Sequence, residues 1–110
     1  MKLDNAEADN RIGLEMERKG DLNGVLGQYR EALRISPENA QYHVNLANLS
    51  YREGQRETAA AEYQKAIALG LETAEINNRV GYTLAEIGRF DEALPYLEQA
   101  SGSSRATRTR

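Results

Sequence analysis

The side chains best suited to catalysis are few and poorly spaced for it. His43 is the only histidine in the 110 residues and there is no cysteine, so one chain cannot assemble a histidine metal cluster, a Ser-His-Asp triad or a thiolate site. The acidic neighbours Glu15 and Glu17, and Asp91 and Glu92, are typical of solvated helix faces and helix starts rather than of a general acid and its base. We interpret His43 as a packing or surface residue. The sequence predicts a protein that is not an enzyme and needs no metal or cofactor.

Composition and charge are those of a single soluble domain. The chain is 40% hydrophobic and 28% charged, with a formal net charge of -3, which disfavours nucleic acid because phosphate binding requires a net basic face. The N-terminal stretch turns polar within a few residues, and no apolar run approaches the roughly 20 residues of a membrane span. We therefore expect no membrane insertion. The lack of cysteine is compatible with the reducing cytoplasm, where we expect the protein to reside.

Residue types recur every 34 residues across nearly the whole chain, which indicates a repeat architecture. Small, apolar, turn and aromatic positions all take part. The matching sets are Ala6, Ala40 and Ala74; Ile12, Leu46 and Val80; Gly13, Ala47 and Gly81; Gly20, Gly54 and Gly88; Val25, Ala59 and Ala93; Tyr29, Tyr63 and Leu97; and Ala32, Ala66 and Ala100.

Each set has a physical reason, and together the sets predict helical hairpins. Small residues such as Gly13 and Ala32 let two helices cross closely, and glycines such as Gly54 reverse the chain between helices. The larger residues recur at helical spacing and supply apolar volume between layers. The predicted helices are 6–19, 22–35, 40–53, 56–69, 73–87 and 90–100.

This pattern resembles the tetratricopeptide repeat family, most clearly in the stretches GDLNGVLGQYREALRISPEN, LANLSYREGQRETAAAEYQKAIALG and VGYTLAEIGRFDEALPYLEQA. The resemblance implies an all-α fold, a right-handed α-solenoid of three antiparallel helix hairpins. The chain departs from the family at the position often held by tryptophan, where Asp9, His43 and Asn77 stand. The expected division is a lead-in at 1–5, repeats at 6–39, 40–73 and 74–101, and a disordered basic tail at 102–110.

The resemblance also implies a curved ribbon whose concave surface is lined by the first helix of each hairpin. We expect this surface to be a groove that binds a protein or a peptide, because arginine, asparagine and tyrosine side chains offer carboxylate, backbone and aromatic contacts. The predicted groove residues are Arg11, Leu14, Arg18, Asn45, Asn48, Tyr51, Arg52, Asn78, Arg79 and Tyr82.

Some chaperone adaptors of this family hold a C-terminal carboxylate with two basic residues and asparagines. Asn45 and Arg79 stand at corresponding positions, but Asn10, Leu14 and Glu75 replace the remaining basic and asparagine residues. An acid and a missing donor in the clamp repel a carboxylate. The sequence therefore argues against recognition of chaperone tails.

The last hairpin suggests a second function. Solenoids need polar terminal faces, yet this chain runs from Ala100 directly into SGSSRATRTR. We expect an uncovered apolar edge at Leu84, Leu94 and Leu97. The alternative function is then a self-assembling scaffold, or a fragment of a longer array, that forms homo-oligomers through its uncapped C-terminal hairpin.

Overall fold

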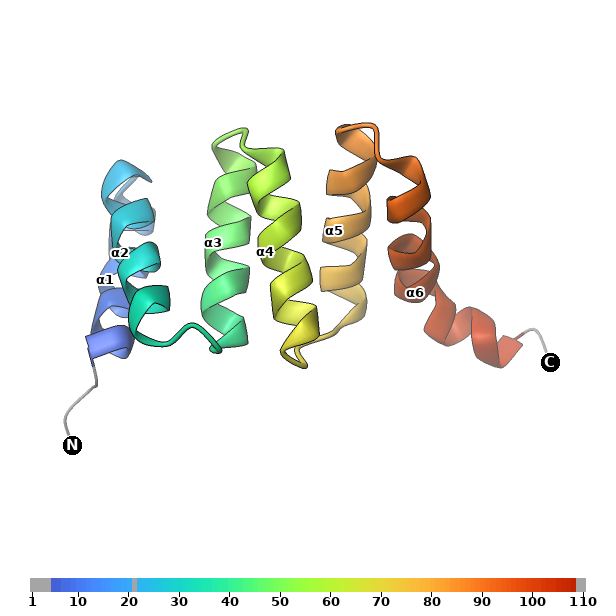
Figure 1. The fold of residues 1–110 in the computed structure, drawn as a ribbon, viewed down its shortest axis with the longest axis horizontal. Coiled ribbons are helices and arrows are strands. Elements are labelled where there is room, and N and C mark those ends of the chain that lie inside the picture. The colour runs from blue at the N-terminus through green and yellow to red at the C-terminus, as the bar shows by residue number, and fades with distance from the viewer. Residues whose placement is uncertain (1–4, 21, 109–110) are drawn as a thin grey trace.

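The protein is a row of three helical hairpins stacked side by side, with its first and last helices at opposite ends of the row (Figure 1). The computed structural model describes residues 5–20 and 22–108. Its helices are α1 (Asn5–Lys19), α2 (Leu22–Ile35), α3 (Ala40–Arg52), α4 (Arg56–Ala68), α5 (Ala74–Glu86) and α6 (Phe90–Arg108). No β-strand occurs in these two ranges. The bounds of the first five helices agree with the predicted ranges to within one residue, and the α-solenoid prediction is confirmed.

The two helices of each hairpin cross where the sequence places its smallest residues. A β-carbon added to Gly13 would lie 2.6 Å from Cε1 of Tyr29, and one added to Gly81 would lie 2.5 Å from Cδ2 of Leu97. These distances are below van der Waals contact, so the hairpins close around missing side chains. The close-approach interpretation of both glycines is confirmed.

The helix ends follow from identifiable residues. Gly20, Gly54 and Gly88 have φ angles of 86°, 84° and 85°, the left-handed conformation in which glycine reverses the chain at no steric cost. Asn39 begins α3 by accepting a hydrogen bond from the backbone N–H of Tyr42, and Thr73 begins α5 in the same way.

The apolar core is spread along the row instead of being gathered at one centre. Val25 and Tyr29 of α2 pack with Leu46 and Leu49 of α3. A larger cluster joins the second and third hairpins and includes Tyr63, Ile76, Val80, Leu84 and Ala93. Each first helix after α1 is therefore held by the second helix of the hairpin before it.

His43 is a buried packing residue that also satisfies its polar atoms. Its Nε2 lies 2.7 Å from the carbonyl oxygen of Pro37, and its Nδ1 lies 2.6 Å from Oε1 of Glu62. A carbonyl oxygen only accepts, so Nε2 donates to Pro37. The imidazole thus ties α3 to α4 at the position where the family often has tryptophan.

Helix α6 is longer than predicted. Instead of ending at residue 100 before a disordered tail, it continues to Arg108; residues 109–110, like residues 1–4 of the lead-in, lie outside the described ranges. A disordered tail was predicted because this stretch lacks apolar residues to bury. Helical backbone hydrogen bonds form without such burial, and no proline follows Ala100 to end the helix.

Two apolar residues lie elsewhere than predicted. Leu84 is fully buried and belongs to the core, so it is not part of an exposed edge: its position on the first helix of the hairpin faces α4. Ile12 was predicted to supply apolar volume between layers, yet it is 46% exposed, because among the described residues α1 packs mainly on α2.

Candidate functional site

The helices α3 and α5 line two adjoining pockets that share Arg79. The first, of about 270 Å³, is lined by Tyr51, Tyr63, Asn78, Arg79, Tyr82, Thr83 and Glu86. The second, of about 300 Å³, is lined by Gln41, Val44, Asn48, Leu71, Thr73, Glu75, Ile76 and Arg79. Together they form a continuous candidate site along neighbouring first helices, which we call the α3/α5 groove.

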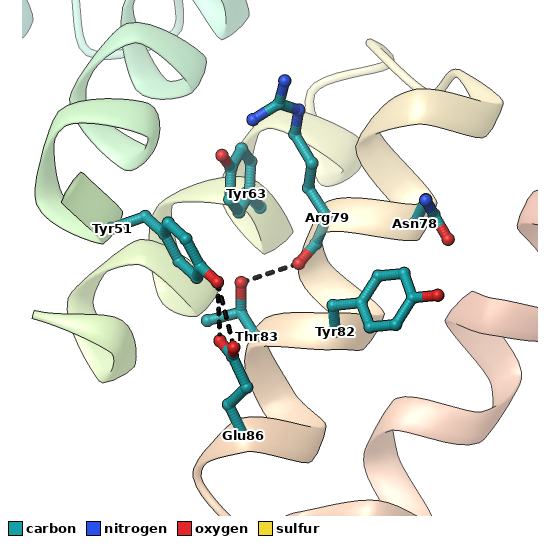
Figure 2. Close-up of a pocket in the computed structure, with 7 residues that line it drawn as sticks. All are labelled: Tyr51, Tyr63, Asn78, Arg79, Tyr82, Thr83 and Glu86. Carbon is teal, nitrogen blue, oxygen red and sulfur yellow. Dashed lines mark hydrogen bonds between the residues drawn. The ribbon is translucent and has the colours of Figure 1, made fainter. Parts of the chain in front are cut away.

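The first pocket is organised by contacts between different hairpins (Figure 2). The Tyr51 hydroxyl donates to both carboxylate oxygens of Glu86, at 2.8 and 3.0 Å. Arg56 of α4 donates from Nε to Oε1 of Glu86 at 3.0 Å, and its guanidinium lies 4.6 Å from the centre of the Tyr51 ring. This cation–π contact and the shared carboxylate fix one side of the pocket.

The electrostatics of the pocket determine the protonation states of the Glu86 carboxyl and the Tyr63 hydroxyl near neutral pH. The hydrogen bond from Tyr51, together with Arg56, holds the pKa of Glu86 below its ordinary value. Burial raises the pKa of the Tyr63 hydroxyl, although the nearby Arg79 guanidinium acts in the opposite direction. Glu86 is therefore an anion and Tyr63 a neutral hydroxyl, which donates to Oδ1 of Asn48.

Arg79 lies between the two pockets and is already paired. Its Nε and Nη2 donate to Oε2 of Glu75 at 3.2 and 3.0 Å, and the Thr83 hydroxyl donates to its backbone oxygen at 2.6 Å (Figure 2). The pair is exposed, so it contributes little to stability.

Tyr82 and Asn78 extend the site toward α6. Figure 2 shows both side chains pointing away from Tyr51 and Glu86, and Tyr82 is 59% exposed. An exposed tyrosine offers a rigid apolar ring with a polar tip, a side chain suited to contact with another protein.

A row of side-chain amides connects the groove to α1. Gln41 donates from Nε2 to Oδ1 of Asn45 at 3.0 Å, and Asn45 donates from Nδ2 to Oδ1 of Asn10 at 2.8 Å. These bonds link the first and second hairpins through their first helices.

The structure brings together part of the predicted groove. Tyr51, Asn78, Arg79 and Tyr82 line the first pocket and Asn48 lines the second. The other five predicted residues line neither: Asn45 bonds to Asn10, Arg18 pairs with Glu15 at 2.8 Å, and Arg11, Leu14 and Arg52 lie exposed.

Sequence reasoning missed Tyr63, Thr83 and Arg56. Tyr63 was predicted to supply apolar volume alone, although a hydroxyl on a buried side chain signals a need for a partner. Thr83 belongs to none of the recurring sets, because Glu15 and Leu49 stand at the corresponding positions. Arg56 begins a second helix, and the rule that first helices form the groove excluded it. No signal in the sequence shows that its side chain crosses to Glu86.

The stacked hairpins and the groove along their first helices define an α-solenoid of the helical-repeat class. The chain belongs to the tetratricopeptide repeat family, whose repeat matches residues 11–70 and 44–106. Members of this family are protein-interaction modules. In the described part of the chain no helix is long and apolar enough to cross a membrane, and no group of three or more acidic or histidine side chains is placed to hold a metal.

Similar proteins are longer than this chain. The type IV pilus assembly protein PilF of Pseudomonas aeruginosa is 33% identical over 91 residues, which cover 83% of this chain and 36% of PilF. Among solved structures, MamA superposes with a TM-score of 0.84 at 22% identity, over 89% of this chain and 54% of MamA. The first tetratricopeptide domain of Spaghetti (RPAP3), bound to the HSP90 peptide SRMEEVD, gives 0.80 at 18% identity, over 93% of this chain and 81% of that domain. At these identities the structures share the fold.

Proposed function

We propose that the chain is an adaptor that binds a peptide segment of a partner protein in the α3/α5 groove. The observation that carries this proposal is that two pockets meet at Arg79 and are lined by tyrosine, asparagine and arginine side chains. Pockets that combine aromatic area with a few directed polar groups are the usual form of a recognition site. The peptide bound by the structurally similar RPAP3 domain supports the same use of the fold.

The groove is better suited to an internal segment than to a C-terminal carboxylate. Glu75 lies in the second pocket and already accepts from Arg79, so a terminal carboxylate would meet an anion beside the guanidinium. An internal segment meets no such repulsion. It would place an aromatic or aliphatic side chain against Tyr82, and its backbone carbonyls would accept hydrogen bonds from Asn48 and Asn78.

The proposal is tested with a displayed library of random peptides. The best selected peptide is titrated by calorimetry against the unchanged chain, Tyr82→Ser and Arg79→Ala, with Arg30→Ala on the exposed side of α2 as the matched control. We expect each groove variant to weaken binding by at least about fivefold, since interface hot spots contribute more than about 1 kcal/mol, and the control to bind normally. Undiminished binding by both groove variants would place the site elsewhere.

A second candidate function is self-association through the outer face of α6. The observation that favours it is that Phe90 and Leu94 on this helix are 66% and 56% exposed. Apolar side chains gathered on one terminal face mark an interaction surface. This function is compatible with peptide binding, because the two surfaces use different residues.

A further inference from the structure

The Tyr51 ring and the Glu86 carboxylate form a site that already holds a guanidinium group. The central carbon of the Arg56 guanidinium lies 4.6 Å from the centre of the ring, and its Nε donates to Oε1 of Glu86 at 3.0 Å. A planar cation prefers these two surfaces, because it stacks on the ring and makes charge-assisted hydrogen bonds to the carboxylate. We call Tyr51 and Glu86 together the guanidinium site.

Arg56 uses only part of what the site offers. Glu86 lines the first pocket, whereas Arg56 reaches the carboxylate from the start of α4. Its bond runs from Nε to Oε1, while Oε2 accepts from the Tyr51 hydroxyl at 3.0 Å. A carboxylate has about four acceptor positions. An arginine entering from the pocket could therefore place two parallel N–H groups on the two oxygens, which is the stronger arrangement.

The repeat itself does not require a basic residue at position 56. Leu22 and Phe90 begin α2 and α6 at the corresponding positions, so two of the three hairpins have an apolar residue type there. A cation in the first turn of a helix also lies at the positive end of the helix dipole, where acidic residues are favoured. What Arg56 contributes in the structure is its contact with the guanidinium site.

The charges of the first pocket favour a cation at this site. Figure 2 shows the guanidinium of Arg79 and the carboxylate of Glu86 at opposite ends of the pocket, and Arg79 is paired with Glu75 at 3.0 Å. An acidic ligand group would be repelled by Glu86 at one end and would compete with Glu75 at the other. A basic group on the Tyr51 ring meets the anion instead.

We propose that the segment bound in the α3/α5 groove carries an arginine, and that this arginine takes the place of Arg56 on the guanidinium site. The proposal rests on the adaptor function and names one residue of the ligand. Arg56 then acts as an internal competitor, because it fills the site in the absence of a partner and so raises the partner concentration that binding requires. Lysine is a weaker occupant, since its ammonium group lacks the planar fork that bonds both carboxylate oxygens at once.

The site is tested first without a peptide, by titrating the full chain with N-acetyl-arginine amide and following backbone amide shifts by NMR. Arg56→Ala should bind this probe about tenfold more tightly than the unchanged chain, because an exposed ion pair and a cation–π contact no longer compete. Adding Glu86→Gln should abolish the gain. Arg34→Ala is the matched control: Arg34 pairs with Glu31 on its own helix, so this variant also frees an exposed carboxylate, and it should bind as the unchanged chain does.

The neutral isostere N-acetyl-citrulline amide shows whether charge decides binding. It should bind Arg56→Ala much more weakly than the arginine probe does. Equal binding of the two probes, an equal gain in Arg34→Ala, or no gain in Arg56→Ala overturns the guanidinium site. The exposed position of Arg56 means that circular dichroism should show unchanged helicity.

The peptides selected from the random library test the role of the site in recognition. Those weakened by Tyr82→Ser or Arg79→Ala should carry an arginine, and replacing it with citrulline should weaken binding to the unchanged chain by about tenfold. Arg56→Ala should strengthen binding of the arginine form and not of the citrulline form.

Failure of this proposal and failure of the adaptor function are distinguishable. Groove-bound peptides that carry no arginine, or that bind Arg56→Ala no more tightly than the unchanged chain, overturn the arginine proposal and leave the adaptor function standing. Peptides indifferent to Tyr82→Ser and Arg79→Ala overturn the adaptor function, and with it the role of the ligand arginine, even where the probe binds Arg56→Ala.

Discussion

Two glycine-to-alanine substitutions in the first hairpin separate backbone entropy from steric crowding. Gly27 lies inside α2 with no atom near its missing β-carbon, whereas a β-carbon on Gly13 would lie 2.6 and 2.8 Å from the Tyr29 ring. Both alanines gain about 1 kcal/mol of helix propensity. Only the one at position 13 forces a fully buried tyrosine to move, and overpacking of this kind costs about 1–3 kcal/mol.

We therefore expect Gly27→Ala to stabilise the protein by about 1 kcal/mol and Gly13→Ala to change stability by between about 0 and 2 kcal/mol in the unfavourable direction. The free energy of unfolding is measured by urea denaturation followed by circular dichroism. Equal stabilisation by the two alanines would refute the claim that the hairpin closes around Gly13. Ala47, which stands opposite Tyr63 at the same position of the second hairpin, shows that a wider crossing is within reach of the fold.

Three further substitutions probe single contacts. His43→Ala should lower the free energy of unfolding by about 1–3 kcal/mol, because it leaves the buried Glu62 carboxylate with Lys65 as its remaining partner, and His43→Leu combined with Glu62→Leu should recover much of the loss in the same urea assay. Thr73→Ala should cost about 1 kcal/mol through loss of the hydrogen bond to the first turn of α5, again by urea denaturation. Because the pKa of Glu86 is lowered in the folded state, its contribution to stability is complete above the ordinary glutamate pKa and is lost as the pH falls through the lower folded value. In thermal denaturation across that acidic range, the melting temperature of Glu86→Gln should decline less steeply with falling pH than that of the unchanged chain. An equal slope would contradict the assignment.

The sequence predicts the helices and their crossings well because both depend on local geometry. A close helix crossing leaves no room for a β-carbon at Gly13 and Gly81, and the turn at Gly54 requires a left-handed backbone conformation. Glycine meets both requirements most easily, and they recur along the repeat. Burial at the ends of the row is harder to predict, since Ile12 has the same apolar type and spacing as its buried counterparts Leu46 and Val80. Its exposure depends on the absence of a neighbouring hairpin in the described structure, which the repeat pattern does not encode.

The candidate groove is predicted only in part for a similar reason. Repeat register identifies which positions face it, and Asn48, Asn78, Arg79 and Tyr82 follow from register alone. The register does not show which of the charged side chains neutralise one another. Long side chains such as Arg56 choose among several partners within reach, and the choice is settled by packing in three dimensions.

The contacts of Arg56 also have a consequence for ligand binding. Its guanidinium stacks on Tyr51 of one hairpin while bonding to Glu86 of the next. A basic ligand group that bound Glu86 would have to displace this side chain, so filling the pocket would exchange a contact between two repeats for a contact with the ligand.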